Sequence, residues 1–362
     1  MSDLLSATLT HLEALVSFDT RNPPRDIGTG GIFDYLREKL PGFRIEVTDF
    51  GAGAVSMLAV RGDPKRLFNV HLDTVPSSEA WSADPLKLRV TGDRAIGLGA
   101  CDIKGAAACL VAAAAVTEGD VAFLFSTDEE ANDARCIAGF LATNHGFNEV
   151  IVAEPTGAEA VLAHRGISSV RMGFRGRAGH ASSADARQQS ALHQAVEWGH
   201  GALALVAAED AQRFGGLTGL RFNIGRIEGG IKANVIAPSA ELRFGFRPLP
   251  SQAMDTLHAR FRELNPSADY EETFRGPSLP GGSIADAEEK RLAARDLADE
   301  LGLPIGNAVD FWTEASLFSA AGMTALVYGP GHIAQAHTAD EWVALDQLHQ
   351  VGEVHRRIME AA

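Results

Sequence analysis

Histidine and carboxylate residues follow several apolar segments of the sequence, at positions where a strand would end. The segment Phe68–Thr74 contains His71 after an apolar run, and Asp73 follows two residues later. A buried strand fixes the direction of the side chains at its carboxyl end, and open α/β sheets place their ligand sites there. In such a pair the histidine can bind a metal ion while the carboxylate orients its ring. Alone, the pair is a weak signal, because a histidine at a strand end is more often a core or loop residue.

Further candidates of the same kind lie at other predicted strand ends. The complete set is His71, Asp73, Asp102, Glu129, Glu130, Glu154 and His337. It combines histidines and carboxylates without a thiolate, a composition that favours hydrolytic zinc, cobalt or manganese over structural zinc. The pair Glu129 and Glu130 alone is better explained as an exposed acidic loop. The repeated position at the ends of apolar strands favours a metal centre instead.

A centre with two metal ions requires one bridging carboxylate and about two further ligands for each ion. We predict that Asp102 is the bridging residue. Two ligand sets then follow, one of Asp102, His71 and Glu154 and the other of Asp102, Glu130 and His337.

Two carboxylates have no ligand role in this assignment. Asp73 is predicted to orient His71. Glu129, an unligated carboxylate beside the ions, is predicted to act as general base toward an attacking water.

The hydrophobic pattern predicts the elements that must position these residues. Apolar strands are expected near residues 68–72, 121–126 and 150–153, with helices between them. Apolar strands alternating with helices predict an α/β fold with a mostly parallel sheet sandwiched by helices. From about residue 166 the order becomes strand, helix, two strands, helix, strand, which is typical of a small ferredoxin-like α+β domain. The predicted division is 1–165 and 274–362 for the catalytic domain and 166–273 for the inserted domain.

Composition excludes several classes of partner. The formal net charge of −15, from 47 acidic and 32 basic residues, argues against nucleic acid and anionic membranes. No apolar run reaches the ~18 residues of a membrane span, and the first residues lack the basic start of a signal peptide. The three cysteines, Cys101, Cys109 and Cys136, form no C-x-x-C pair. We therefore expect a cytoplasmic protein with reduced thiols.

Several segments resemble the co-catalytic zinc hydrolases of the aminoacylase and carboxypeptidase-G type. They are HLDT (71–74), GLGACDIKG (97–105), STDEE (126–130), AEPT (153–156), QAHTADE (335–341), and the stretches 176–182, 229–236 and 311–315. Within this family the sequence is most similar to the branch of N-acetylcitrulline and N-acetylornithine deacetylases of arginine biosynthesis. The resemblance covers nearly the whole chain.

The resemblance implies roles that the residues alone do not give. It implies two divalent ions, Zn²⁺ or Co²⁺, held by the ligand sets above, with Glu129 as general base. It implies that the inserted domain is a lid through which a homodimer forms. His180 would then reach the active site of the partner subunit and polarise the scissile carbonyl. Without the resemblance, His180 is simply a surface or core histidine of the inserted domain.

The resemblance also implies substrate contacts. Asn234 and Arg247 would bind substrate, Arg247 through a bidentate contact to an α-carboxylate; a solvated strand end explains Arg247 equally well. Gly329 and Gly331 would lie in a loop near the substrate, although a plain turn explains them too. An ornithine side chain requires a carboxylate at its tip, and Glu314 is the candidate for that contact.

The predicted function is hydrolysis of an N-acetyl amino acid, N-acetyl-L-citrulline or N-acetyl-L-ornithine, to acetate and the free amino acid. A succinyl-diaminopimelate desuccinylase or a dipeptidase of the same family is an alternative. A non-catalytic metal-binding scaffold is an alternative of a different class. The scaffold is disfavoured because a degenerate copy would be expected to lose Glu129 first.

Overall fold

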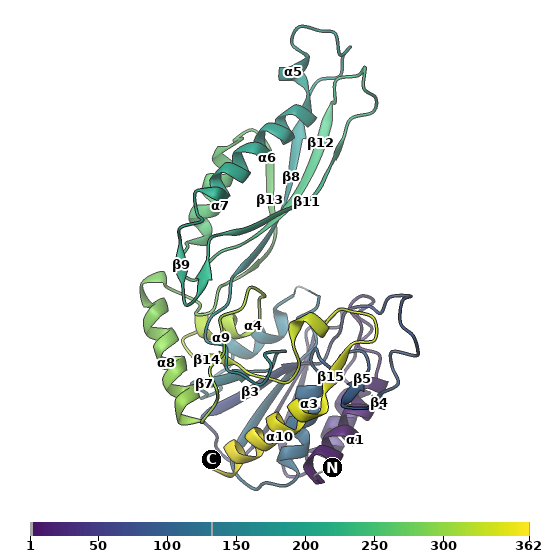
Figure 1. Cartoon of the computed structure of the whole chain (residues 1–362), viewed down its shortest axis with the longest axis vertical. Helices are drawn as coiled ribbons and strands as arrows, with labels where there is room; N and C mark the ends of the chain where they lie inside the picture. Colours follow the sequence, from purple (N-terminus) through teal and green to yellow (C-terminus); the bar gives the residue numbers. More distant parts are fainter. Residues whose placement is uncertain (1–2, 132, 362) are drawn as a thin grey trace. The chain divides into compact units, whose positions relative to one another are not determined.

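The computed structural model describes residues 3–131 and 133–361 of the chain (Figure 1), which forms two compact units. Unit 1 comprises residues 1–162, 289–307 and 313–362, and unit 2 comprises residues 163–288 and 308–312. Among the described residues, no helix combines the length and the apolarity that crossing a bilayer requires.

The centre of unit 1 is a six-stranded sheet with the order β1-β2-β6-β3-β7-β14. β6, β3, β7 and β14 are parallel to one another, whereas β1 and β2 add two antiparallel pairings at one edge. The strands are β1 (Arg44–Asp49), β2 (Val55–Arg61), β3 (Arg66–His71), β6 (Val121–Ser126), β7 (Glu149–Val152) and β14 (Thr324–Val327). β6 is buried along its whole length, which explains its uninterrupted apolar sequence. The predicted mostly parallel sheet is confirmed.

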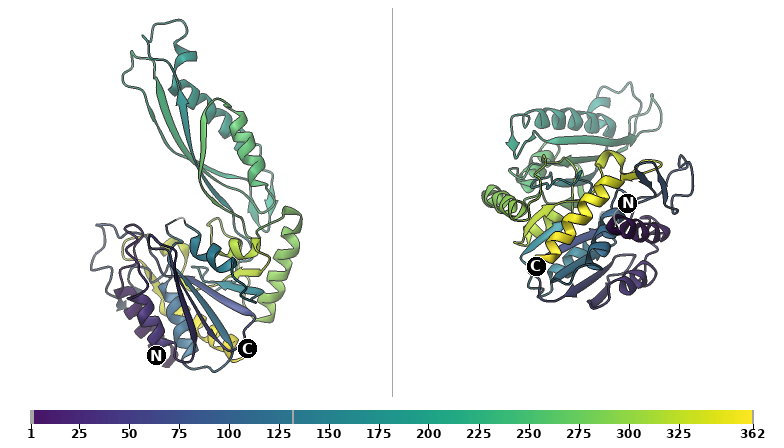
Figure 2. Two further views of the ribbon diagram at one scale, coloured as in Figure 1. Left: turned by 180° about the vertical axis from the view of Figure 1, so that it is seen from behind. Right: turned by 60° about the horizontal axis from the view of Figure 1, so that its bottom comes forward.

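Helices cover both faces of this sheet. α1 (Asp3–Ser17), α3 (Lys104–Ala114) and α10 (Leu345–Glu360) pack against one another, and α3 contacts β3 (Figure 2). α3 is buried along its whole length, because its small alanine side chains allow close packing on the sheet. α4 (Arg135–Leu141) and α9 (Ala315–Ala320) pack together beside β7 and β14.

The other elements of unit 1 are short. A three-stranded sheet has the order β15-β5-β4. The remaining bounds are α2 (Ile32–Lys39), β4 (Arg89–Thr91), β5 (Arg94–Ile96), α8 (Ala287–Glu300), which begins in unit 2, η2 (Ile333–Gln335) and β15 (Trp342–Ala344).

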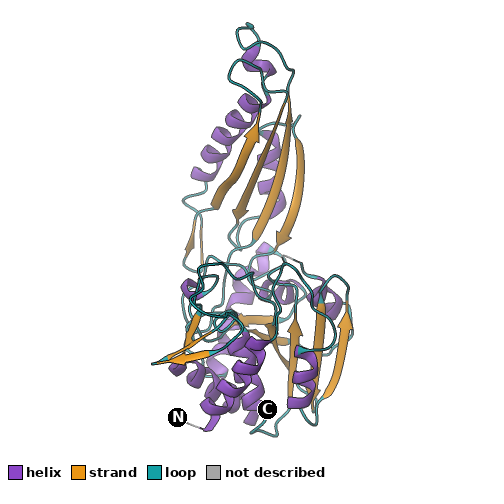
Figure 3. Cartoon of the chain, turned by 90° about the vertical axis from the view of Figure 1, so that its right-hand side faces the viewer, coloured by secondary structure: helices purple, strands orange, loops and turns teal. Residues whose placement is uncertain are grey.

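Unit 2 is an antiparallel sheet with helices on one face (Figure 3). Its strands have the order β11-β12-β8-β13, and the chain order β8-α6-β11-β12-α7-β13 is that of a ferredoxin-like domain. The bounds are β8 (Ile167–Arg175), α5 (Ala186–Gln189), α6 (Ala191–Ala207), β9 (Arg213–Phe214), β10 (Leu217–Thr218), β11 (Arg221–Gly229), β12 (Ser239–Arg247), α7 (Met254–Glu263), β13 (Asp269–Gly276) and η1 (Ile284–Asp286).

Some boundaries differ from those predicted. The hydrophobic pattern predicts one helix over residues 187–208, but the structure interrupts it at Ser190. The backbone of Ser190 is extended, and its hydroxyl group caps α6 by accepting a hydrogen bond from the His193 N–H. Unit 2 extends beyond the predicted return at residue 273, because β13 pairs with β8 as far as Gly276. Residues 308–312 also belong to unit 2, where Asp310 forms an ion pair with the buried Arg165. α9 and β15 were not predicted, because elements this short carry little periodicity.

Candidate metal centre

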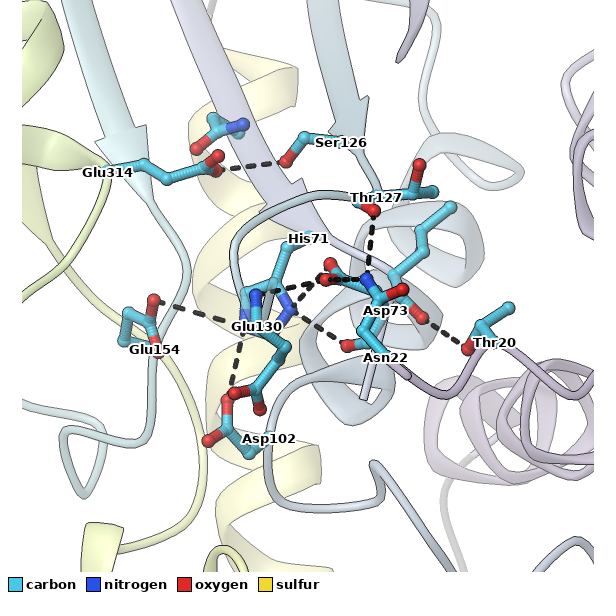
Figure 4. Close-up of polar contacts among 12 residues, drawn as sticks. Thr20, Asn22, His71, Asp73, Asp102, Ser126, Thr127, Glu130, Glu154 and Glu314 are labelled. Atoms are coloured by element: carbon cyan, nitrogen blue, oxygen red, sulfur yellow. Dashed lines mark hydrogen bonds and ion pairs between the residues drawn. The ribbon is translucent and has the colours of Figure 1, made fainter. Parts of the chain in front are cut away.

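Three of the predicted ligands meet at the carboxyl ends of the parallel strands of unit 1. His71 is the last residue of β3, Glu154 follows β7, and Asp102 lies in the loop between β5 and α3. His71 Nε2 is 3.2 Å from Asp102 Oδ1 and 4.0 Å from Glu154 Oε1. Figure 4 shows these side chains turned toward one another. All three are buried, and their ligand atoms lie within 4.8 Å of one another, close enough to bind one cation.

A second group shares Asp102 with the first. His337 Nε2 is 3.3 Å from Asp102 Oδ2 and 2.9 Å from Glu130 Oε1. One oxygen of Asp102 therefore faces His71 and the other faces His337, as a bridging carboxylate requires. His337 has φ 58, a left-handed conformation that is uncommon for a histidine and is often associated with functional sites.

Asp73 contacts one residue of each ligand group, His71 of the first and Glu130 of the second. Its backbone carbonyl is 3.0 Å from His71 Nδ1 and can accept a hydrogen bond from it, and its Oδ1 lies 3.5 Å from the same nitrogen. Its Oδ2 accepts hydrogen bonds from Asn22 Nδ2 (2.6 Å) and from the Glu130 N–H (2.9 Å). Asn22 also donates to the carbonyl of Thr127, so it anchors the segment that follows β6 (Figure 4). Asp73 can thus orient a ligand of the first group while fixing the backbone of a ligand in the second.

The charge balance of this region fits divalent cations. Burial raises the pKa of Glu154 well above its usual range, and the charges of Asp102 and Glu130 raise it further. Burial lowers the pKa of His71, but hydrogen bonds to Asp102 and Asp73 outweigh this effect and raise it well above its usual value. Hydrogen bonds to Asp102 and Glu130 raise the pKa of His337 to about 10. Buried carboxylates in excess over histidines require a compensating positive charge, which one or two metal ions would supply.

Glu129 belongs to neither ligand group among the described residues. Its pKa is raised well above the usual range, first by burial and then by the neighbouring charges of Glu154, Glu130 and Asp102. Glu129 is therefore an unassigned carboxylate next to both groups, with a raised proton affinity. These are the properties of a general base.

The two predicted loop glycines lie against the ligand segments. A Cβ on Gly329 would meet the carbonyl oxygen of Glu154 at 2.6 Å, so this position requires the absence of a side chain. Gly331 has φ 87, and a Cβ there would lie 2.5 Å from Cys101 Sγ. Because both positions lack a side chain, the loop after β14 can lie close to Glu154 and to Cys101, the residue before Asp102. Their contact with substrate stays a prediction.

Glu314 is buried in unit 1 rather than exposed to solvent, with 1% of its surface accessible. Its Oε2 accepts a hydrogen bond from the Ser126 hydroxyl at 2.9 Å (Figure 4). Burial, followed by the charge of Asp128, raises the pKa of Glu314 from 4.5 to about 8. At neutral pH the neutral acid is therefore the main form of this side chain when no cation is bound beside it.

The substitution Glu314→Gln is expected to alter the pH dependence of stability. Above about pH 4.5 the unfolded chain ionises at Glu314 while the folded chain stays protonated, so the wild-type protein loses stability as the pH rises toward 8. Glutamine cannot ionise in either state. The stability of the variant relative to wild type should therefore rise by a few kcal/mol across this window, measured by urea unfolding of the metal-free proteins. The exposed Glu13→Gln is the control, and parallel pH curves for Glu314→Gln and wild type would contradict the assignment.

Two predicted residues of unit 2 lie beside each other. His180 and Asn234 are exposed, and their segments are joined by a backbone bridge between His180 and Val235 and a hydrogen bond from the Ala181 N–H to the Asn234 carbonyl. His180 Nδ1 is 2.7 Å from the Ser182 hydroxyl, which leaves Nε2 to contact a substrate. Both residues lie beyond the Ser239 end of β12.

Arg247 lies at the opposite end of the same strand. β12 has nine residues, and at about 3.3 Å per residue its ends are roughly 26 Å apart. Arg247 lines a hollow of about 270 Å³ together with Arg221 and Asn223. Unit 2 of one chain therefore does not bring His180 and Arg247 together around one small molecule.

Sequence reasoning missed two residues that hold the ligands. For Asn22 the sequence indicates only a place in the Asn-Pro-Pro segment 22–24, which ends the first helix. Glu341 is buried and accepts hydrogen bonds from the loop that carries Asp102. The position of Glu341, four residues after His337, was the signal that could have identified it.

Comparison of the sequence with known proteins identifies a family with which this chain shares most of its length. The sequence model of peptidase family M20/M25/M40 matches residues 67–361. An N-acetyl-L-citrulline deacetylase of Xanthomonas campestris pv. campestris is 69% identical over 362 residues, which cover 99% of each chain. An acetylornithine deacetylase of Myxococcus xanthus is 31% identical, with 96% of this chain and 95% of that protein aligned.

A solved structure shares the fold at low identity. The aminopeptidase PepT of Bacillus cereus superposes with a TM-score of 0.73 and 19% identity, covering 98% of each chain. At this identity the similarity concerns the fold alone.

Proposed function

The chain belongs to peptidase family M20/M25/M40, and from this we propose that it is a metal-dependent deacetylase that hydrolyses N-acetyl-L-citrulline to acetate and citrulline. The observation that carries the proposal is the arrangement of Asp102, whose two oxygens face histidines of two different ligand groups. The 69% identity to an N-acetyl-L-citrulline deacetylase supports the substrate, and a place in arginine biosynthesis follows from that substrate.

The ions in this proposal are Zn²⁺ or Co²⁺. One would be held by Asp102, His71 and Glu154 and the other by Asp102, Glu130 and His337. The donor atoms of both groups are imidazole nitrogens and carboxylate oxygens, which suit these ions. When bound, the ions would lower the pKa of water and polarise the acetyl carbonyl.

In this proposal the side chains transfer the proton, orient a metal ligand, stabilise the oxyanion and bind the substrate. Glu129 takes the proton of the attacking water and later returns it to the leaving amine. Asp73 fixes the ring of His71, so that the ligand geometry does not change during the reaction. His180 donates a hydrogen bond to the oxyanion that develops on the acetyl carbonyl. Arg247 binds the α-carboxylate of the substrate and Asn234 contributes a further polar contact.

We further propose a homodimer in which His180 and Asn234 serve the site of the partner subunit. The support comes from unit 2, where these residues and Arg247 lie at opposite ends of β12. A single amino-acid substrate is too short to touch both ends of one strand. Two copies of the chain, each contributing one end, could assemble around one substrate.

The state of Glu314 favours citrulline over ornithine. The citrulline side chain ends in a neutral ureido group, whereas the ornithine side chain ends in an ammonium that needs a carboxylate partner when desolvated. Glu314, the carboxylate predicted for that contact, is buried, bonded to Ser126 and neutral at neutral pH.

We therefore expect kcat/KM for N-acetyl-L-citrulline to exceed that for N-acetyl-L-ornithine by about 10–100-fold. The measurement is release of acetate with each substrate at the same added Co²⁺ or Zn²⁺ concentration. Succinyl-diaminopimelate is the comparison for a desuccinylase. Faster hydrolysis of N-acetyl-L-ornithine or of the succinyl substrate would refute the assignment of citrulline.

A further inference from the structure

The carboxylate of Glu341 is a buried acceptor for three backbone N–H groups. Its Oε1 accepts from Cys101 (2.8 Å) and from Asp102 (3.0 Å), and its Oε2 accepts from Gly99 (3.1 Å). The residue is 1% exposed. All three donors belong to the loop between β5 and α3, which carries the residue shared by both ligand groups.

The other backbone hydrogen bonds of this loop use different N–H groups: Leu98 N–H donates to the Pro85 carbonyl at 2.9 Å, and Ala100 N–H donates to the Gly97 carbonyl at 3.0 Å. The loop lies between the end of β5 at Ile96 and the start of α3 at Lys104, and it belongs to neither element. Gly99 has φ 78, and a Cβ there would lie 2.7 Å from a methyl carbon of Thr74, so the turn itself requires glycine. The N–H groups of Gly99, Cys101 and Asp102 have the Glu341 carboxylate as their partner.

Glu341 also connects this loop to the second ligand group. Its backbone carbonyl accepts a hydrogen bond from the Gly97 N–H at 3.0 Å, and β15, which begins at the next residue, pairs with β5. His337 lies four residues before Glu341 on the same segment. One residue thus fixes the bridging carboxylate through its side chain and lies on the segment that carries a terminal ligand.

We propose that Glu341 is a positioning residue that holds Asp102 in the bridging orientation between the two ligand groups. The inference rests on the proposed two-metal function and extends it to a residue outside both ligand groups. A bridging carboxylate must be held within about 0.5 Å of its productive position, because both ions depend on its two oxygens. Residues of this supporting kind typically change metal affinity by about 10–100-fold when they are removed.

The test compares Glu341→Gln and Glu341→Asp with wild type. Glutamine is nearly isosteric but presents an amide N–H₂ to one of the backbone donors, and aspartate keeps the charge but is shorter by one methylene. The affinity of each metal-free protein for Co²⁺ is measured by competition with a chelator, and the visible spectrum of the Co²⁺-loaded protein reports the geometry of its ligands. Circular dichroism shows that the compared proteins are folded. The control is Glu353→Gln, which removes a charge from a partly exposed ion pair with Arg356 on α10.

We expect folded Glu341→Gln to bind Co²⁺ about 10–100-fold more weakly than wild type, with an altered spectrum. Glu341→Asp should show a smaller loss of Co²⁺ affinity and a smaller change in the spectrum. If Glu341→Gln does not fold, the Glu341→Asp variant alone is compared with wild type. Glu353→Gln should match wild type. Wild-type affinity and spectrum in a folded Glu341 variant would overturn the positioning role and leave the proposed function intact. Failure of the wild-type protein to bind Co²⁺ at all would instead reject the two-metal function on which the inference rests.

Discussion

Replacement of Glu129 by glutamine is expected to lower kcat by about 10²–10⁴-fold while metal content stays at the wild-type level. Glu129 lies outside both ligand groups, so the amide removes no ligand. It does remove the proton acceptor, whose pKa is raised by burial and by the charge of Glu154. Acetate release and metal content of the same preparation are the two measurements.

Glu130→Gln is the matched control for this prediction. It makes the same chemical change at the adjacent residue, but Glu130 contacts His337 at 2.9 Å within the second ligand group. We expect this variant to lose metal as well as activity. Near wild-type turnover in Glu129→Gln would remove the general-base assignment, and loss of metal from it would make Glu129 a ligand.

A second large effect is expected at His180. His180→Ala should lower kcat by about 10²–10³-fold, the usual consequence of losing one donor to a developing oxyanion. Metal content should not change, because His180 belongs to unit 2 and the ligand groups belong to unit 1. Loss of metal in this variant would mean that His180 is a ligand.

Mixing the two inactive variants tests whether His180 acts on the partner subunit. In a dimer of one Glu129→Gln chain and one His180→Ala chain, the second chain keeps Glu129 and receives His180 from the first. Random reassociation of equal amounts should restore about a quarter of wild-type activity, since half of the dimers are mixed and each has one complete site. A mixture of Glu129→Gln with Glu130→Gln should restore none. Activity no higher than that of the separate variants would place His180 in the site of its own chain or exclude the dimer.

The fold was predictable where the hydrophobic pattern is strong. β3, β6 and β7 are rich in apolar residues, which run without interruption from Val121 to Phe125 in β6, and the alanine-rich α3 has the composition of a helix packed closely on a sheet. The parallel arrangement then brings His71, Glu154 and Glu130 to one edge of the sheet. The pattern could not predict α9 or β15, whose formation depends on tertiary neighbours.

The supporting residues were harder to predict than the ligands. Asn22 and Glu341 contact the ligand segments only because distant parts of the chain fold together: Asn22 is 51 residues from Asp73 and Glu341 is 239 residues from Asp102. Neither lies at the end of an apolar strand. The predicted strand-end position is wrong for two ligands as well, because Asp102 lies between β5 and α3 and His337 follows η2.

The candidate substrate-binding residues could be named from the sequence, but their positions in the fold could not be predicted. Arg247 and Asn234 could be named from resemblance, but no sequence pattern indicates that Arg247 ends β12 while Asn234 lies beyond the other end of that strand. Glu314 could be named as a carboxylate, but its burial against Ser126 and its neutral state depend on the folded environment.

We propose that two metal ions, both bound by Asp102, enable this chain to deacetylate N-acetyl-L-citrulline. Titration of the metal-free enzyme with Co²⁺ or Zn²⁺, while acetate release from N-acetyl-L-citrulline is measured, tests this most directly. We expect negligible activity without metal and a rise that ends at two equivalents per chain, with the titration abolished in Asp102→Asn. Full activity in the chelated, metal-free enzyme, or no acetate release at any metal concentration, would contradict the account.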